Sequence, residues 1–475
     1  MTRLLLTIAG AIAFGAGCAG ASASYQDMRR AAWAEEPARG PAPAAADSGS
    51  ERAAAPAAAS RPAGQDGPFA GLDELTSETL VAATLARNPG LGAMRAAWQA
   101  AVERYPQVTA LDDPELAYGI APGTIGARDL DFGQRFDLSQ RLPWPGRLAA
   151  RGEGALGEAA AAGAEYEATR QDLIAAARDT FYAYYFADRA LATNATTTDL
   201  LIDLQRAAEG RYAAGLAAKA DPLSAELAYH RSHHRRYELE RTRAVAAARI
   251  RALVNLPADA PVPPPPAELA VPAAEPPVAA LLCAALRERP EIAALRHEID
   301  ARRAAVREAG LDYFPTLTAM AVYDGLWERE EQRPMVGVGV NLPLQLERRR
   351  AAVSEARARL RAAESRLEER RARVRFEVER AAEEVAEQSH LVYLAETAIV
   401  PAARESLTAS RSAYESGEAD FLRVIEGDRA LELAELAHHA AVADYHKARA
   451  RLARAAGVPD LDVAGAAPAG TEVCP

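Results

Sequence analysis

A strictly alternating stretch, residues 129–143, places the tightest constraint on the fold of this chain. Most of its even positions carry apolar side chains, at Leu130, Phe132, Phe136, Leu138 and Leu142. A period of two is typical of a β-strand with one apolar and one polar face. After Pro145 and Gly146 the sequence is helical in character for about 70 residues. Since a single strand leading into so long a helix does not suit a compact globular domain, we interpret the strand as membrane-embedded and the helix as running away from the membrane.

The chain also repeats itself, with an offset of about 200 positions. The landmarks that recur are the pairs Pro89 and Pro290, Pro114 and Pro315, Pro143 and Pro343, Tyr212 and Tyr414, and Pro257 and Pro459. Each copy reads helix, strand, strand, very long helix, turn and long helix. We therefore predict a mainly α fold with a small β part, whose four strands lie at residues 115–120, 130–142, 316–323 and 335–342.

The N-terminus has the pattern of an export signal, because Arg3 precedes an apolar core that is too short to span a membrane as a helix. Two processing outcomes remain open. Cleavage after Ala23 follows a small-x-small site, whereas Gly17 and Cys18 resemble a bacterial lipoprotein junction with the lipid on Cys18.

Composition then divides the chain into segments. We predict a signal peptide at residues 1–23 (or 1–17 with lipid on Cys18) and a disordered tether at 24–71. The first repeat follows at 72–257, a Pro-rich linker at 258–277, the second repeat at 278–459 and a flexible tail at 460–475.

Charge and motifs exclude several function classes. A net charge of −11 argues against nucleic-acid binding. Cys18, Cys283 and Cys474 lie far apart, so we expect neither a metal site nor a disulfide framework. No nucleophile elbow, phosphate loop or zinc signature occurs, so we predict no enzyme, no cofactor and no metal.

The helices of the second copy carry heptad repeats. Apolar residues recur every seven positions at Val353, Leu360, Leu367, Val374 and Ala381, and after the turn at Val424, Leu431, His438, Tyr445 and Leu452. A helix of about 70 residues is about 105 Å long and must pack laterally against partners.

Four strands cannot close a barrel, and lipid does not tolerate open strand edges. Several chains must pool their strands, and three chains supply enough for a pore, although the pattern alone does not fix the number.

The passage LSQRLPWPGRL at residues 138–148, its echo GVNLPLQLERR from Gly339, and two Tyr-x-x-Gly turns resemble the TolC family of bacterial outer-membrane efflux factors over residues 72–459. The resemblance implies a homotrimer in the outer membrane of a Gram-negative bacterium. It implies a shared twelve-stranded β-barrel in the lipid, completed as a trimer, and long antiparallel helical hairpins that form an α-barrel through the periplasm.

The same resemblance implies a passive exit duct for small molecules or metal ions in a tripartite efflux pump. Its partners are then outer-membrane lipid, a periplasmic adaptor (membrane fusion) protein and an inner-membrane transporter, including the resistance-nodulation-division type. The Pro-Trp-Pro-Gly strand exit is similar to members that serve heavy-metal pumps. Two alternatives are the duct of a type I protein secretion system and an exported coiled-coil scaffold without a pore, which the alternating strands argue against.

The family resemblance also singles out the two helical turns. It implies that Tyr212, Gly215, Tyr414 and Gly417 form hairpin tips that contact the adaptor, although glycine at a helix C-terminus is also an ordinary cap. It places a periplasmic gate at Arg423 and Glu426, with Asp420 nearby. Glu426 fits the acidic pattern and Arg423 departs from it, so the pair is alternatively a lock between hairpins or a surface pair of a few tenths of a kcal/mol.

Three further polar sites have local interpretations. We predict Ser77 and Asp221 as N-caps of helices. His230, His233 and His234 share one helical face at a spacing that can bind a transition metal. Because arginines surround them and no carboxylate accompanies them at a set distance, we favour a solvated helix face.

Overall fold

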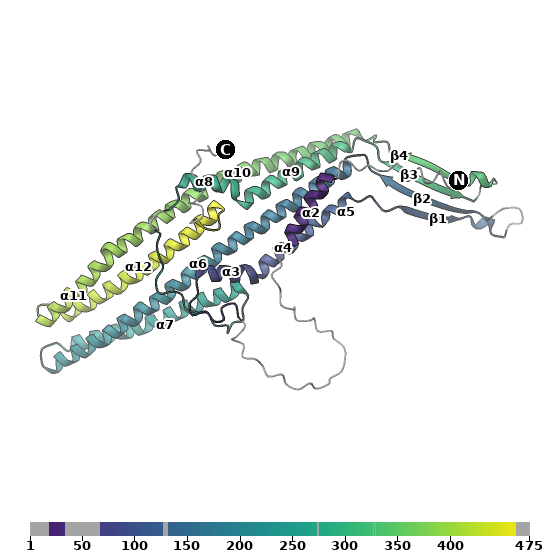
Figure 1. Cartoon of the computed structure of the whole chain (residues 1–475). Helices are drawn as coiled ribbons and strands as arrows, with labels where there is room; N and C mark the ends of the chain where they lie inside the picture. Colours follow the sequence, from purple (N-terminus) through teal and green to yellow (C-terminus); the bar gives the residue numbers. More distant parts are fainter. Residues whose placement is uncertain are drawn as a thin grey trace, which may run out of the picture. The chain divides into compact units, whose positions relative to one another are not determined.

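The computed structural model describes residues 19–33, 67–126, 132–272, 275–325, 327 and 329–461. Most of the predicted signal peptide, tether residues 34–66 and tail residues 462–475 lie outside the described residues. The chain forms two compact units. The sheet unit comprises Met1–Glu36, Ala93–Tyr166 and Pro290–Arg370, and the hairpin unit comprises Pro37–Gly92, Glu167–Arg289 and Arg371–Pro475. Figure 1 shows their elements in chain order.

The two halves of the chain share one pattern, in which short helices precede two strands and long helices follow them. The described chain begins with α2 (Ala19–Trp33). The first half then contains α3 (Ser77–Arg87), α4 (Pro89–Val102), α5 (Arg104–Thr109), β1 (Glu115–Ile120), β2 (Gln134–Leu142), α6 (Arg147–Ala213) and α7 (Ala220–Val254). The second half contains α8 (Val278–Glu288), α9 (Pro290–Leu311), β3 (Leu317–Asp324), β4 (Pro334–Val340), α10 (Leu346–Leu394), α11 (Val400–Ser416) and α12 (Phe421–Ala456). Among the described residues, none of these helices has the length and apolar character needed to cross a bilayer.

The four predicted strands are present, and they form one antiparallel sheet in the order β1-β2-β3-β4 (Figure 1). Residues 130 and 131 of the predicted second strand lie outside the described residues, and β2 begins at Gln134. The register places Leu138 between Leu116 and Ala321, and Thr318 between Arg141 and Gly339. Residues that pair across neighbouring strands project from the same face of the sheet. The apolar residues of the four strands therefore lie mainly on one face, and the polar residues lie on the other.

The apolar face of the sheet is exposed in the single chain. Its most exposed large side chains are Leu116, Tyr118, Ile120, Leu138, Val336, Val338 and Val340. The opposite face carries the polar members, including Glu115, Arg135, Asp137, Ser139, Arg141, Thr318 and Asp324.

The helices of the sheet unit approach one another closely through small residues. A Cβ atom built on Gly157 of α6 would come within 2.9 Å of the Ala301 Cβ of α9. α2 packs nearby, because Tyr25 stacks on Tyr105 with ring centroids 5.0 Å apart and Arg29 pairs with Glu103 at 3.0 Å. Residues 24–33 therefore form a packed helix and not the disordered tether that composition predicts.

The hairpin unit has two cores. One contains Phe181, Tyr184 and Ile250 with α3, and the other contains Leu204, Leu407 and Val424 nearer the turns. On α12 the predicted heptad residues Val424, Tyr445 and Leu452 are buried, and Leu431 and His438 are half-buried. The alanine stripe beside them is buried, at Ala434, Ala441, Ala448 and Ala455. Small side chains on this stripe allow the close helix contacts that a lateral packing requires.

Two local predictions are wrong. The N-cap of α3 is Thr76 and not Ser77, because the Thr76 and Thr79 side chains each bond the other residue's backbone N–H in a capping box. Cys283 is disulfide-bonded, which corrects the expectation that the cysteines form no disulfide. Cys18 and Cys474 lie outside the described residues.

Candidate functional site

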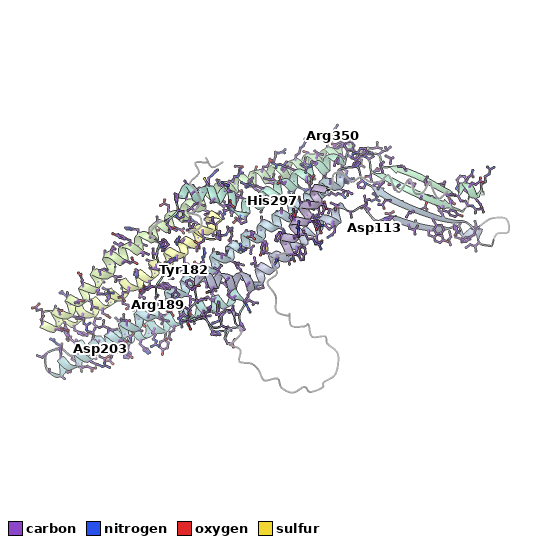
Figure 2. The ribbon with its side chains drawn as sticks, in the orientation of Figure 1. Asp113, Tyr182, Arg189, Asp203, His297 and Arg350 are labelled. Atoms are coloured by element: carbon purple, nitrogen blue, oxygen red, sulfur yellow. The ribbon has the colours of Figure 1, made fainter. Side chains whose placement is uncertain are left out.

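The first hairpin turn joins α6 to α7. Gly215 adopts a φ of +74° in the left-handed region, which only glycine reaches at low cost. The Leu216 N–H then donates to the Arg211 carbonyl at 2.9 Å and closes the end of α6. Tyr212 and Gly215 lie exposed at this turn. Figure 2 labels Asp203 on the part of α6 that approaches the turn.

The second turn joins α11 to α12 in the same way. Gly417 has a φ of +81°, and its N–H donates to the carbonyls of Ala413 and Tyr414. The Glu418 N–H donates to the Ala413 carbonyl at 2.8 Å. Both glycines therefore have a structural role as helix caps, while Gly417 also remains exposed at the tip.

Tyr414 differs from the other three tip residues because it is buried, with 7% of its surface exposed. Its ring meets Phe421 edge-on at 5.2 Å, and the Arg211 guanidinium lies 4.6 Å from the ring centroid. Arg211 also donates from Nη1 to the Glu415 carbonyl at 3.2 Å. Arg211 and Tyr414 thus tie the α6 end of the first hairpin to the α11 end of the second.

Asp221 belongs to the same contact and not to a helix cap. The N-cap of α7 is Lys219, and Asp221 lies in the first turn, so the N-cap prediction for Asp221 is wrong. Burial raises the pKa of Tyr414, the Asp221 carboxylate raises it further, and Arg211 opposes both. The Tyr414 hydroxyl is buried without a well-formed hydrogen bond in the described residues, so Asp221 acts on it chiefly through its charge.

The three predicted gate residues are exposed on the first turns of α12. Asp420 is the N-cap of α12, but its side chain makes no capping hydrogen bond. Arg423 and Glu426 lie three positions apart, and within the part of the chain that the structure describes they form no ion pair with each other. The interpretation as an i,i+3 surface pair therefore has no contact to support it in the single chain.

A buried acidic group lies one turn further along α12, and the sequence interpretation missed it. Asp428 is 5% exposed. Glu432 follows it by one turn and lies 3.6 Å from Arg235 of α7, while Glu435 pairs with Arg404 of α11 at 3.3 Å. The only sequence signal was the position of Asp428, four residues after the buried heptad residue Val424.

The histidines are arranged differently from the prediction in one respect. Glu226 lies 3.9 Å from His230, and Glu238 lies 3.6 Å from His234, so carboxylates do accompany these side chains. Among the described residues, no group of three or more potential metal ligands forms a site. On α12, burial, His438 and Arg189 lower the pKa of His439 to about 4, which keeps that imidazole neutral.

A family model described as outer membrane efflux protein matches the chain over residues 80–256 and 281–458. No curated protein sequence matches significantly. Several solved structures are similar in fold. A membrane protein from Pseudomonas aeruginosa has a TM-score of 0.70 and 21% identity over 86% of this chain and 96% of that one.

VceC from Vibrio cholerae has a TM-score of 0.68 and 17% identity over 80% and 96% of the two chains. CmeC from Campylobacter jejuni has a TM-score of 0.67 and 14% identity over 80% and 85%. These likenesses confirm the long-hairpin and four-strand fold, and the family match confirms the resemblance to TolC-like efflux factors. The chain belongs to the outer membrane efflux protein family, whose members are outer-membrane channels with a periplasmic helical extension and not enzymes.

Proposed function

We propose that three copies of this chain assemble into the passive exit duct of a tripartite efflux pump. The observation that carries the proposal is the two-faced sheet. Among the described residues, β1 pairs only with β2 and β4 pairs only with β3, so each chain has two unpaired strand edges. In lipid, unpaired backbone groups cost several kcal/mol each. Three four-stranded sheets joined edge to edge remove these edges, turn the apolar face toward lipid and turn the polar face toward a lumen.

The outer helices of the hairpin unit support lateral assembly. Most of α7 is exposed, and its exposed large apolar side chains are Leu223, Leu227, Tyr237 and Val245. These positions fall on one side of the helix, at the spacing of a helix–helix seam. A neighbouring copy that covered them would remove apolar surface from water and complete a ring of hairpins.

We further propose that the hairpin turns form the periplasmic mouth. The contacts of Arg211, Asp221 and Tyr414 hold the two hairpins of one chain together and favour a closed state. The exposed side chains of Asp420, Arg423 and Glu426 then set the charge of the mouth. Tyr212, Gly215 and Gly417 are accessible to a periplasmic adaptor. Tyr414 is buried between the hairpins and becomes accessible to the adaptor only when they separate. An adaptor that binds the separated form better shifts the duct toward it.

The remaining assignments are also proposals. The inner-membrane partner is a transporter such as one of the resistance-nodulation-division type, and the cargo is a small molecule or a metal ion. The repeats span 72–257 and 278–459 around a Pro-rich linker, and export begins with the N-terminal signal, with Cys18 as the site of lipid attachment if cleavage precedes it.

Single-channel recording from purified oligomer in planar bilayers tests the proposal. We expect a small resting conductance in the wild type and a larger one in the double variant Arg211→Ala, Asp221→Asn, because the ties between the hairpins are lost. Asp203→Asn is a matched control, since Asp203 is exposed on α6 and pairs only locally with Arg206. A wild-type oligomer without conductance steps would refute the duct, and equal traces for all three proteins would refute the closing contact.

A further inference from the structure

A polar cleft of about 510 Å³ lies in the sheet unit where the strands meet the helices. Its walls come from the end of β2, the start of α6, and the ends of β3 and β4 that adjoin the helices. The polar side chains that line it are Asp112, Arg141, Arg147, Arg151, Thr316, Thr318 and Asn341. Figure 2 labels Asp113, the neighbour of Asp112, at this end of the strands.

Positive charge dominates the lining of this cleft. Arg141, Arg147 and Arg151 face a single lining carboxylate, that of Asp112. The contact between Arg141 Nη1 and Asp112 Oδ2 is long, at 3.7 Å, and both side chains are more than 60% exposed. The interaction free energy of such an exposed ion pair is small, so Asp112 offsets the positive charge of Arg141 only weakly.

The other two arginines are held by carboxylates that are not part of the lining. Arg147 Nη2 lies 2.7 Å from Asp312 Oδ1, and Arg151 Nε lies 2.6 Å from Glu308 Oε1. Neither acid lines the cleft. A guanidinium has five N–H donors. These ion pairs therefore fix the two arginines while leaving further donors of each for a ligand in the cleft.

The backbone adds to the positive potential. Arg147 is the first residue of α6, and the N-terminus of a long helix carries about half a positive charge. A cation at this position is unfavourable by itself, and the Asp312 carboxylate lies beside it. Threonine hydroxyls and the Asn341 amide supply additional hydrogen-bond donors at the same cleft.

We propose that this cleft is a binding site for small multivalent oxyanions, that is, carboxylates or phosphates of permeating molecules. The sheet register supports a lumenal location, because Arg141 and Thr318 share the polar face with Arg135 and Asp137. That location rests on the proposed duct, whereas binding of the anion does not. Further along the same face, Glu115, Asp137 and Asp324 outnumber Arg135, which confines the positive region to the cleft and makes it a discrete site in the path of the cargo.

Citrate is a suitable probe, and isothermal titration calorimetry of the detergent-purified oligomer is the primary measurement. We expect Arg141→Gln to weaken citrate binding about tenfold, as for loss of one charge-assisted hydrogen bond. Asp112→Asn should tighten binding about threefold, because it removes the one lining anion. Both residues are exposed, so neither change endangers folding. Arg350→Gln is the control, since Arg350 is exposed, pairs with Glu347 and does not line the cleft.

Opposite effects of the Arg141 and Asp112 variants, with an unchanged control, would support the site. Absence of citrate binding, or equal binding by all four proteins, would overturn it. Block of single-channel current by citrate tests the lumenal location separately. A silent bilayer with citrate binding intact would refute the duct and leave the anion site standing, whereas a conducting channel that citrate neither binds nor blocks would refute the site alone.

Discussion

Replacement of Asp428 by asparagine tests how the hairpin unit is held together. Asp428 is buried on α12. Burial, which is the largest cause, and the nearby carboxylates of Glu432 and Glu435 together raise the pKa of its carboxyl from the ordinary value of 3.8 to about 7, against the opposing charge of Arg411 of α11. Asparagine keeps the size of the side chain and removes the charge.

The sign of the effect follows from the direction of the shift. Because the native pKa exceeds the unfolded value, the native state holds the proton more tightly. The stabilisation from this group is complete below about pH 4 and is lost as the pH rises through about 7. The difference between 3.8 and about 7 corresponds to an upper value of about 4 kcal/mol, at about 1.36 kcal/mol per pH unit. Water entry and relaxation reduce such penalties, so we expect Asp428→Asn to stabilise the protein by about 2 kcal/mol at pH 8.

Urea unfolding followed by circular dichroism, at pH 4 and at pH 8, measures this difference. The variant should unfold at higher urea than the wild type at pH 8 and at nearly the same urea at pH 4. Asp444→Asn is the control on the same helix, because Asp444 is half exposed and pairs with Lys447. A variant that is less stable than the wild type at pH 8 would refute the reasoning, since it would mean that the ionised carboxylate stabilises the native state.

Three further outcomes follow from the packing and the covalent structure. Gly157→Val should destabilise the sheet unit by about 1–3 kcal/mol in a thermal melt, because a side chain there meets Ala301, whereas Gly310→Ala, with open space around it, should not. Phe181→Ala should cost about 3–5 kcal/mol in the same assay, since Phe181 is 1% exposed in the core of the hairpin unit. Peptide mapping without reduction should recover Cys283 in a disulfide-linked peptide; a free Cys283 thiol would contradict this.

The strands could be predicted from sequence because their constraint is local. Alternation in β2 and β4 is nearly strict, and a shift of one residue would exchange the two faces. All four strands lie where they were predicted: β1 has the predicted bounds, and the other three differ from prediction at their ends. The long helices of the second half could be predicted as well, because a heptad repeat is also a local pattern.

Features that depend on contacts distant in sequence were harder to predict. α2 reads as polar and alanine-rich, and its order comes from contacts with Glu103 and Tyr105. A π-helical turn at Ala395–Ile399, just before Pro401, separates α10 from α11. Proline lacks an N–H and clashes with the preceding turn. Ile399, seven residues after the buried Val392, is accordingly 44% exposed.

The candidate site also contains features with a local sequence signal and features that depend on contacts distant in sequence. The glycine turns were predictable because a positive φ favours one residue type. The contact of Asp221 with Tyr414 joins two hairpins about 200 positions apart, and no local pattern distinguishes it from a capping aspartate. The burial of Asp428 likewise depends on packing in the folded hairpin unit, where Arg411 of α11 lies close enough to act on its carboxyl.

Labelling of single cysteines along β2 tests most directly whether this sheet separates lipid from a water-filled lumen. Variants of Arg135, Asp137, Ser139 and Arg141 should react with a charged, membrane-impermeant thiol reagent in proteoliposomes. Variants of Phe136, Leu138 and Leu142 should remain unlabelled. Reactivity that does not alternate along the strand would contradict the account.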